Sequence, residues 1–187
     1  MAVIDTGIDF EHPELSAAMA GGFNAVDVDK PEAFKDDQGH GTHVAGTIAA
    51  ARDGKGVVGV APKAKLYAVK VLDAEGNGTF SSVIAGIEWC VKNGIQVANM
   101  SLGASEGSQA LSEAVAAAAE AGLVIVAAAG NDYGGAVSFP GAYPQVITVS
   151  SSDKKDRLSV FSSVGPEVDV IAPGSDVKSS RMGGGFV

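Results

Sequence analysis

Short apolar runs alternate with amphipathic stretches along most of the chain. The apolar runs are rich in valine, isoleucine and alanine. Several are apolar at every position, which is typical of parallel strands that are covered on both faces. These runs predict strands at 2–4, 66–72, 97–100, 123–128, 146–149 and 168–171.

Three segments between these runs have the spacing of helices. Apolar residues recur every three or four positions over 80–92. An alanine-rich stretch over 109–121 follows the N-cap candidate Ser108 and ends at Gly122. Small residues fill a third segment at 41–51. Each predicted helix therefore lies between two predicted strands.

Strands and helices in alternation predict an α/β fold. We expect a doubly wound, mostly parallel sheet with helices on both faces, arranged in three layers. Neither end of the pattern looks finished, because the first strand begins almost at residue 1. The expectation is a single partial domain over 1–187 that is incomplete at both ends.

Composition and charge exclude several classes of function. The net charge of −9 and the pI of about 4.7 argue against nucleic acid or an anionic membrane as a partner. No apolar run reaches transmembrane length. Cys90 is the only cysteine, so an internal disulfide is impossible, and its apolar neighbours predict a small buried side chain.

Polar residues follow three of the predicted strands. Asp5 comes after "AVI", Ser101 after "VANM" and Asn131 after "LVIVAAAG". In doubly wound sheets, chemistry gathers at the carboxyl ends of the strands. These three positions are therefore the first candidates for a functional site.

Two of the three histidines, His40 and His43, lie in "DDQGHGTHVAGT". A metal site is disfavoured, because no carboxylate accompanies them in the H-E-x-x-H manner and His12 precedes a proline as turn residues do. His43 falls inside a helix of small residues, where packing or hydrogen bonding explains it. His40 begins that helix, where the positive end of the dipole disfavours imidazolium, so we expect a neutral ring that accepts a proton.

A base of this kind needs a group that fixes its tautomer. Asp5 could accept a hydrogen bond from one ring nitrogen of His40 and favour the imidazolium as it forms. Spacing alone leaves open that Asp5 is only a cap or turn residue. Asn131, in "AAAGND", is either an ordinary turn asparagine or an amide donor aimed at negative charge on a substrate oxygen.

Together these segments resemble the subtilisin-like serine proteases, the subtilase family or peptidase family S8. "VIDTGID" is similar to the segment of the catalytic aspartate, and "HGTHVAGT" to that of the catalytic histidine. "NMSLG" and "AAAGN" resemble the substrate-cleft strand and the oxyanion-asparagine turn. The resemblance covers essentially all 187 residues. It implies a serine endopeptidase that works through an acyl-enzyme, with Asp5, His40 and Asn131 as catalytic residues.

The resemblance also implies an extended peptide or protein substrate, bound by strand addition. Two backbone edges are implied to pair with that peptide, at Gly76, Asn77 and Gly78 and at Ser101, Leu102 and Gly103. The pocket for the side chain before the cleaved bond is implied to involve Ala128, Gly130, Ser138 and, at its mouth, Asp132. Phe80 is implied to lie near a more distant apolar pocket. A monomer is expected, usually a secreted one, although the acidic charge also suits an intracellular member.

The loop "AARDGKGVVG" at 50–59 resembles the calcium loop of the family. The implied Ca²⁺ ligands are oxygens of Glu14, Ala51, Asp53, Lys55 and Val57. Glu14 stands where the family usually has an aspartate, and a ligand from an N-terminal segment is absent, so we expect a weakened site. An exposed Asp-Gly turn is the alternative. The same loop fits G-x-G-x-x-G, but it follows a helix and not a strand, so a dinucleotide site is rejected.

The family's nucleophile segment, G-T-S-M-A-x-P, does not occur in this sequence. Ser175, Ser179 and Ser180 lack the glycine-threonine lead-in and the helix that should follow. We therefore expect a fragment that is inactive as a protease alone. Two alternatives stay open: a non-catalytic pseudo-protease that binds peptides, and a structural or regulatory α/β domain with a calcium loop.

Overall fold

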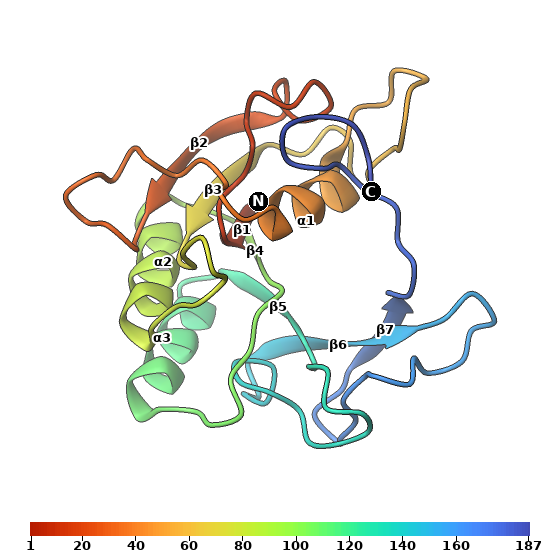
Figure 1. Cartoon of the computed structure of the whole chain (residues 1–187). Helices are drawn as coiled ribbons and strands as arrows, with labels where there is room; N and C mark the ends of the chain where they lie inside the picture. Colours follow the sequence, from red (N-terminus) through yellow and green to blue (C-terminus); the bar gives the residue numbers. More distant parts are fainter. The chain divides into compact units, whose positions relative to one another are not determined.

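The computed structural model describes all 187 residues, which divide into two compact units (Figure 1). The first unit comprises Met1–Ile95 and Lys178–Val187, and the second comprises Gln96–Val177. The strand pairs within each unit are parallel, and the chain is an α/β protein, as predicted. The single-domain organisation stays a prediction. None of the helices is long and apolar enough to cross a bilayer.

The first unit contains three strands and two helices. Its strands lie in the order β2-β3-β1. The C-terminal segment, dark blue in Figure 1, returns to this unit beside α1, where the Ser179 hydroxyl donates to the His43 carbonyl. The elements are β1 (Ala2–Asp5), β2 (Met19–Asn24), α1 (His40–Ala49), β3 (Leu66–Lys70) and α2 (Phe80–Lys92).

Helices cover both faces of the sheet in the first unit. The β1–β3 register pairs Val3 with Ala68, and these two residues form one apolar cluster with the small side chains of α1. Ile4 points to the opposite face, because neighbouring residues of a strand alternate in direction. There Gly86 of α2 lies so close that a Cβ on it would be 2.9 Å from Val69. The predicted three layers are therefore present in this unit.

The second unit has four strands in the order β4-β5-β6-β7 and one helix, α3, which packs on β5. Along β5 and β6, Ile125 and Thr148 are almost fully buried, whereas Val124 and Ile147 on the other face are 44% and 41% exposed. The helix therefore covers one face of this sheet. The elements are β4 (Val97–Met100), α3 (Gln109–Glu120), β5 (Val124–Ala128), β6 (Val146–Ser152) and β7 (Val170–Pro173).

The secondary structure differs from the prediction in β2 and in the bounds of several elements; β3 ends at Lys70 and not at residue 72, and β7 begins at Val170 and not at residue 168. The apolar pattern misses β2, because its sequence, "MAGGFN", has two glycines and little apolar periodicity. This strand forms because it pairs with β3, with an irregularity between Met19 and Gly21. β6 and β7 extend three and two residues beyond the predicted ends, because Ser151 and Ser152 pair with Ala172 and Pro173.

The lone cysteine behaves as predicted. Cys90 is completely buried in α2 and makes no disulfide. Burial raises the pKa of its thiol to about 12. A thiol of this kind stays protonated at physiological pH and has a structural role.

Candidate active site

The carboxylate of Asp5 lies at the carboxyl end of β1 and is fully buried. All four residues of β1 are buried, so the strand holds the carboxylate on a rigid support. The next residue also helps, because the backbone N–H of Thr6 donates to Asp5 Oδ1 over 2.8 Å. A buried carboxylate needs such donors, since it has lost its hydration.

His40 is the first residue of α1. Gly39, directly before it, has a φ of 113°, a left-handed conformation that turns the chain into the helix. The ring Nδ1 of His40 lies 2.8 Å from Asp5 Oδ1 and 2.9 Å from Asp5 Oδ2. The predicted contact between the two side chains is therefore confirmed. Because Nδ1–H is engaged by Asp5, Nε2 is the nitrogen that can accept a proton.

The pKa of His40 shifts in the direction opposite to the one that the helix terminus alone would give. The hydrogen bond to Asp5 raises the pKa of His40, burial opposes this rise, and the charges of Asp5 and Asp36 add to it. The helix dipole acts weakly on a side chain at the surface. A buried carboxylate at hydrogen-bond distance therefore decides the basicity of the ring.

The other two histidines, His43 and His12, lie within the packed structure away from the Asp5–His40 contact. His43 lies within α1 and is half-buried, as the helix pattern predicts. His12 is 2% exposed, which the loop pattern does not indicate. Its Nδ1 accepts a hydrogen bond from the Glu14 backbone, and its Nε2 lies 2.9 Å from the Gly185 carbonyl oxygen. No group of three His, Cys, Asp or Glu side chains is placed to hold a metal ion.

In the second unit, Asn131 follows β5 at an exposed turn. Gly130, with a φ of 110°, makes this turn possible. A Cβ on Gly130 would lie 2.4 Å from the Ser138 hydroxyl, and one on Gly103 would lie 2.8 Å from the Ser138 Cβ.

A cavity of about 230 Å³ lies in the second unit and is lined, among others, by Ser101, Ala128, Gly130 and Asn131. The structure therefore gathers most of the residues implied for the pocket, while Asp132 is exposed beside it.

The other implied substrate edge belongs to the first unit. Gly76, Asn77 and Gly78 form the loop between β3 and α2. Two hydrogen bonds between Asp73 and Asn77 close this loop. The Asp73 carboxylate accepts from the Asn77 backbone N–H, and the Asp73 backbone N–H donates to the Asn77 carbonyl. Phe80 begins α2 and is 40% exposed. The loop is thus held by hydrogen bonds to Asp73, and Asn77 and Gly78 are exposed.

The residues implied for calcium lie near one another in the first unit. The Ala51 backbone N–H donates to the Glu14 carbonyl over 3.0 Å. Glu14 is 6% exposed, and its Oε2 is buried without a hydrogen-bond partner. Asp53 Oδ1 accepts from the Lys55 backbone N–H. An unpartnered, buried carboxylate oxygen beside the loop suits a cation ligand.

The three C-terminal serines have other hydrogen-bond partners or none. The Ser175 hydroxyl lies 2.7 Å from the Ser159 hydroxyl. Ser179 donates to the His43 carbonyl, and Ser180 is fully buried without a partner for its hydroxyl. These settings suit packing and not nucleophilic attack.

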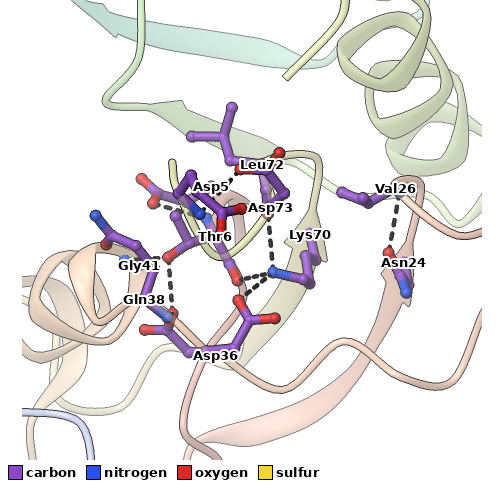
Figure 2. Close-up of polar contacts among 12 residues, drawn as sticks. Asp5, Thr6, Asn24, Val26, Asp36, Gln38, Gly41, Lys70, Leu72 and Asp73 are labelled. Atoms are coloured by element: carbon purple, nitrogen blue, oxygen red, sulfur yellow. Dashed lines mark hydrogen bonds and ion pairs between the residues drawn. The ribbon is translucent and has the colours of Figure 1, made fainter. Parts of the chain in front are cut away.

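Three buried polar residues next to the Asp5–His40 pair escape the sequence interpretation. They are Thr6, Asp36 and Lys70 (Figure 2). Asp36 lies in the polar run "DDQGHG", where nothing distinguishes it from its neighbours. Lys70 lies in the apolar run of β3, and a lysine inside such a run was the one available signal.

A model of the Subtilase family matches residues 1–185. The chain belongs to the subtilase family. Subtilisin E from Bacillus subtilis (strain 168) is 46% identical to all of this subtilase chain. Minor extracellular protease Epr from the same strain is 46% identical over 97% of it. A crystal structure of a cold adapted subtilisin-like serine proteinase shares 40% identity with a TM-score of 0.90, over all of this chain and 66% of the other.

This subtilase chain spans about half the length of the curated relatives that it matches. It covers 49% of subtilisin E and 28% of Epr. The resemblance deduced from the motifs is confirmed, and so is the α/β fold of the family.

Proposed function

We propose that this chain supplies the general base, its orienting carboxylate and an oxyanion donor to a serine endopeptidase that cleaves peptide bonds through an acyl-enzyme. One observation carries the proposal: the imidazole of His40 meets the buried carboxylate of Asp5 through Nδ1 at 2.8 Å. The side chain of His40 is 48% exposed, and Nε2, which Asp5 does not engage, is the nitrogen that would accept the proton of the enzyme's serine.

The proposed reaction uses these residues in sequence. His40 Nε2 takes the proton of a serine hydroxyl as the oxygen attacks the peptide carbonyl, and Asp5 stabilises the imidazolium that forms. The same proton then passes to the leaving amine, which leaves an acyl-enzyme for water to hydrolyse. The serine itself is proposed to lie outside these 187 residues, since no G-T-S segment occurs among them.

Asn131 is proposed to donate its side-chain amide to the tetrahedral oxyanion. Its exposed position at a turn beside the cavity supports this role. Removal of the asparagine donor lowers kcat by a factor of about 10²–10³. This factor was measured in subtilisin itself and is not deduced for this chain.

The proposed substrate is an extended stretch of peptide. The Gly76–Gly78 loop and the Ser101–Gly103 segment each offer backbone groups for strand addition. The cavity beside Asn131 has small walls at Ala128 and Gly130, and Ser138 lies next to Gly130, so we propose that it accepts an apolar or aromatic side chain. An extracellular location and a monomeric state are proposed from the family, and Epr is named as an extracellular protease.

A structural Ca²⁺ ion is part of the proposal, because the implied donor set is compatible with it. The carboxylates of Glu14 and Asp53, with the carbonyls of Ala51, Lys55 and Val57, would hold the ion, which would neutralise the unpartnered Glu14 Oε2. Its proposed effect is to tie the loop to the first unit. No catalytic cofactor is proposed.

The test measures hydrolysis of a peptide anilide by the protein made from its complete coding sequence. Asp5→Asn should lower kcat about 10⁴-fold, because the carboxylate would no longer fix the tautomer of His40. Asp29→Asn, which removes the charge of an exposed loop carboxylate, serves as the matched control. Peptide binding without any turnover would instead support the pseudo-protease.

The 187-residue chain gives a second test. A serine-directed phosphonate should leave it unlabelled, because no serine in it has an activated setting. A stable adduct mapped to Ser175, Ser179 or Ser180 would contradict this part of the proposal.

A further inference from the structure

Asp36 is a buried carboxylate that the proposed reaction does not use. It is 4% exposed and lies in the loop before α1, close to a second buried carboxylate, Asp5. Two desolvated carboxylates in one region are unfavourable unless each is well supplied with hydrogen-bond donors. The position of Asp36 therefore needs an explanation beyond chain connectivity.

The carboxylate of Asp36 holds the first turn of α1. Its Oδ1 accepts from the backbone N–H of Gln38 and of Gly39, and its Oδ2 accepts from the backbone N–H and the hydroxyl of Thr42. Gly39, the N-cap, has no side chain for this purpose. Asp36 thus accepts hydrogen bonds from backbone N–H groups at the start of α1 that the side chain of the N-cap residue usually accepts. These groups belong to the turn that carries His40.

The same carboxylate also holds the segment that carries Asp5. The Thr6 hydroxyl donates to Asp36 Oδ1 over 2.8 Å and accepts from the Gly41 backbone N–H over 2.9 Å. Thr6 directly follows Asp5 and donates its own N–H to the Asp5 carboxylate. Figure 2 shows Thr6 between Asp5, Asp36 and Gly41. One buried group therefore joins the two chain segments whose side chains form the Asp5–His40 pair.

Lys70 fixes Thr6 from the other side. Its ammonium is almost completely buried and donates to the carbonyls of Thr6 and Leu72, each over 2.8 Å (Figure 2). It also donates to the carboxylate of Asp37. The main chain of Thr6 is thus held by Lys70, and its side chain by Asp36. Asp37, in contrast, has a half-exposed carboxylate that accepts a hydrogen bond from Lys70.

We propose that Asp36 is the positioning residue of this site, which through Thr6 and the first turn of α1 sets the Asp5–His40 hydrogen bond. The inference deepens the proposed function and rests on it for its catalytic meaning. Asp36 does not touch a reacting atom. Its effect on the reaction passes through the geometry and basicity of His40.

Electrostatics supports this role. Burial would raise the pKa of Asp36, but the hydrogen bonds from Thr42, Gly39 and Gln38 outweigh it and lower the pKa. The carboxylate therefore stays charged while His40 titrates. Its charge is among the causes that raise the pKa of His40.

The experiment follows the His40 ring by NMR in the protein made from its complete coding sequence, with Asp36→Asn compared with Asp37→Asn. Both changes remove one carboxylate charge from neighbouring positions, and only the first removes an acceptor of the Thr6 and α1 bonds. Asp36→Asn should abolish the low-field Nδ1–H signal of His40 and lower its pKa. Asp37→Asn should keep the signal.

Two results would overturn the inference: an unchanged signal and pKa in Asp36→Asn, or an equal loss in Asp37→Asn. If Asp36→Asn fails to fold, as judged from its amide spectrum, Thr6→Val and Thr6→Ser replace it. Valine removes the bridging hydroxyl and should abolish the signal, whereas serine keeps the hydroxyl and should restore it; a signal in both would refute the inference. Because neither readout needs turnover, failure of the proposed protease function would be seen separately.

Discussion

The two units of this chain support their candidate residues in different ways. In the first unit, helices cover both faces of the sheet, and Asp5 and His40 rest on a strand and a helix that are closely packed. In the second unit, α3 covers one face, and Asn131 lies at an exposed turn after β5. The first unit holds Asp5, Asp36 and Lys70 out of water, and each of these three has several hydrogen bonds.

The difference matters for the proposed chemistry. A base and its carboxylate must keep one geometry to within a fraction of an ångström, so rigid elements suit them. A donor such as Asn131 needs a backbone that can turn sharply, which Gly130 provides. The first unit therefore depends on packing, and the second on loop conformation.

The sharpest test of this comparison is a pair of matched isoleucines. Ile4 in the first unit is fully buried, and Ile147 in the second is 41% exposed. Ile4→Ala should lower the free energy of unfolding by about 2–5 kcal/mol, because it leaves a cavity between packed layers. Ile147→Ala should lower it by less than about 1 kcal/mol, since little contact is lost there.

Urea unfolding of both variants measures the two values. Equal losses would mean that the exposed face of the second unit is covered in solution, and the comparison would fail. Such a result would also call for measurement of the molar mass, because a second copy of the chain could cover that face.

The fold was largely predictable because its signals are local. Val3 and Ile4 in β1, or Ile125 in β5, belong to apolar runs that carry the strand signal by themselves. β2 could not be predicted in this way, since Gly21 and Gly22 weaken its pattern and pairing with β3 supplies its structure. Tertiary pairing overrides weak local propensity in such segments.

The site was predictable only where motif residues also stood at the end of a predicted strand or the start of a predicted helix. Asp5 and His40 were found from their positions and from the family resemblance, and their contact is present. The rise in the pKa of His40 was not predicted, because it depends on the hydrogen-bond distance and the burial that the fold gives to the contact with Asp5. Asp36 was missed for the same reason: in sequence it is one of two adjacent aspartates, and only the fold buries it.

A smaller effect should come from crowding at two glycines, one in each unit. A Cβ on Gly41 would lie 2.0 Å from the Gly7 carbonyl oxygen, which belongs to main chain that cannot give way. Gly41→Ala should therefore cost about 1–3 kcal/mol of stability and push α1 away from β1. The NMR signal of the Asp5–His40 hydrogen bond should weaken with it.

Gly103 in the second unit gives the matched change. A Cβ there would lie 2.8 Å from the Ser138 Cβ, a longer approach than the 2.0 Å at Gly41 and one to a side chain, not to main chain. Gly103→Ala should cost less stability than Gly41→Ala in the same thermal or urea assay, and should narrow the space beside Ser138. A greater loss in Gly103→Ala would show that the loop of the second unit is as rigid as the packed layers of the first.

The smallest expected effect separates a buried from an exposed carboxylate by acid titration. The pKa of Asp36 is lowered in the folded first unit, so Asp36 contributes stability above its unfolded pKa and loses that contribution as the pH falls through the folded value. Asp153 in the second unit has a pKa lowered to about 2 by hydrogen bonds from Arg157, but in an exposed ion pair that salt screens. The free energy of unfolding should therefore fall less steeply below about pH 4 in Asp36→Asn than in the unchanged protein. In Asp153→Asn, measured in 0.15 M salt, the fall should be nearly the same as in the unchanged protein. An equally flattened curve for Asp153→Asn would mean that burial is not what makes the first unit hold its charges more firmly than the second.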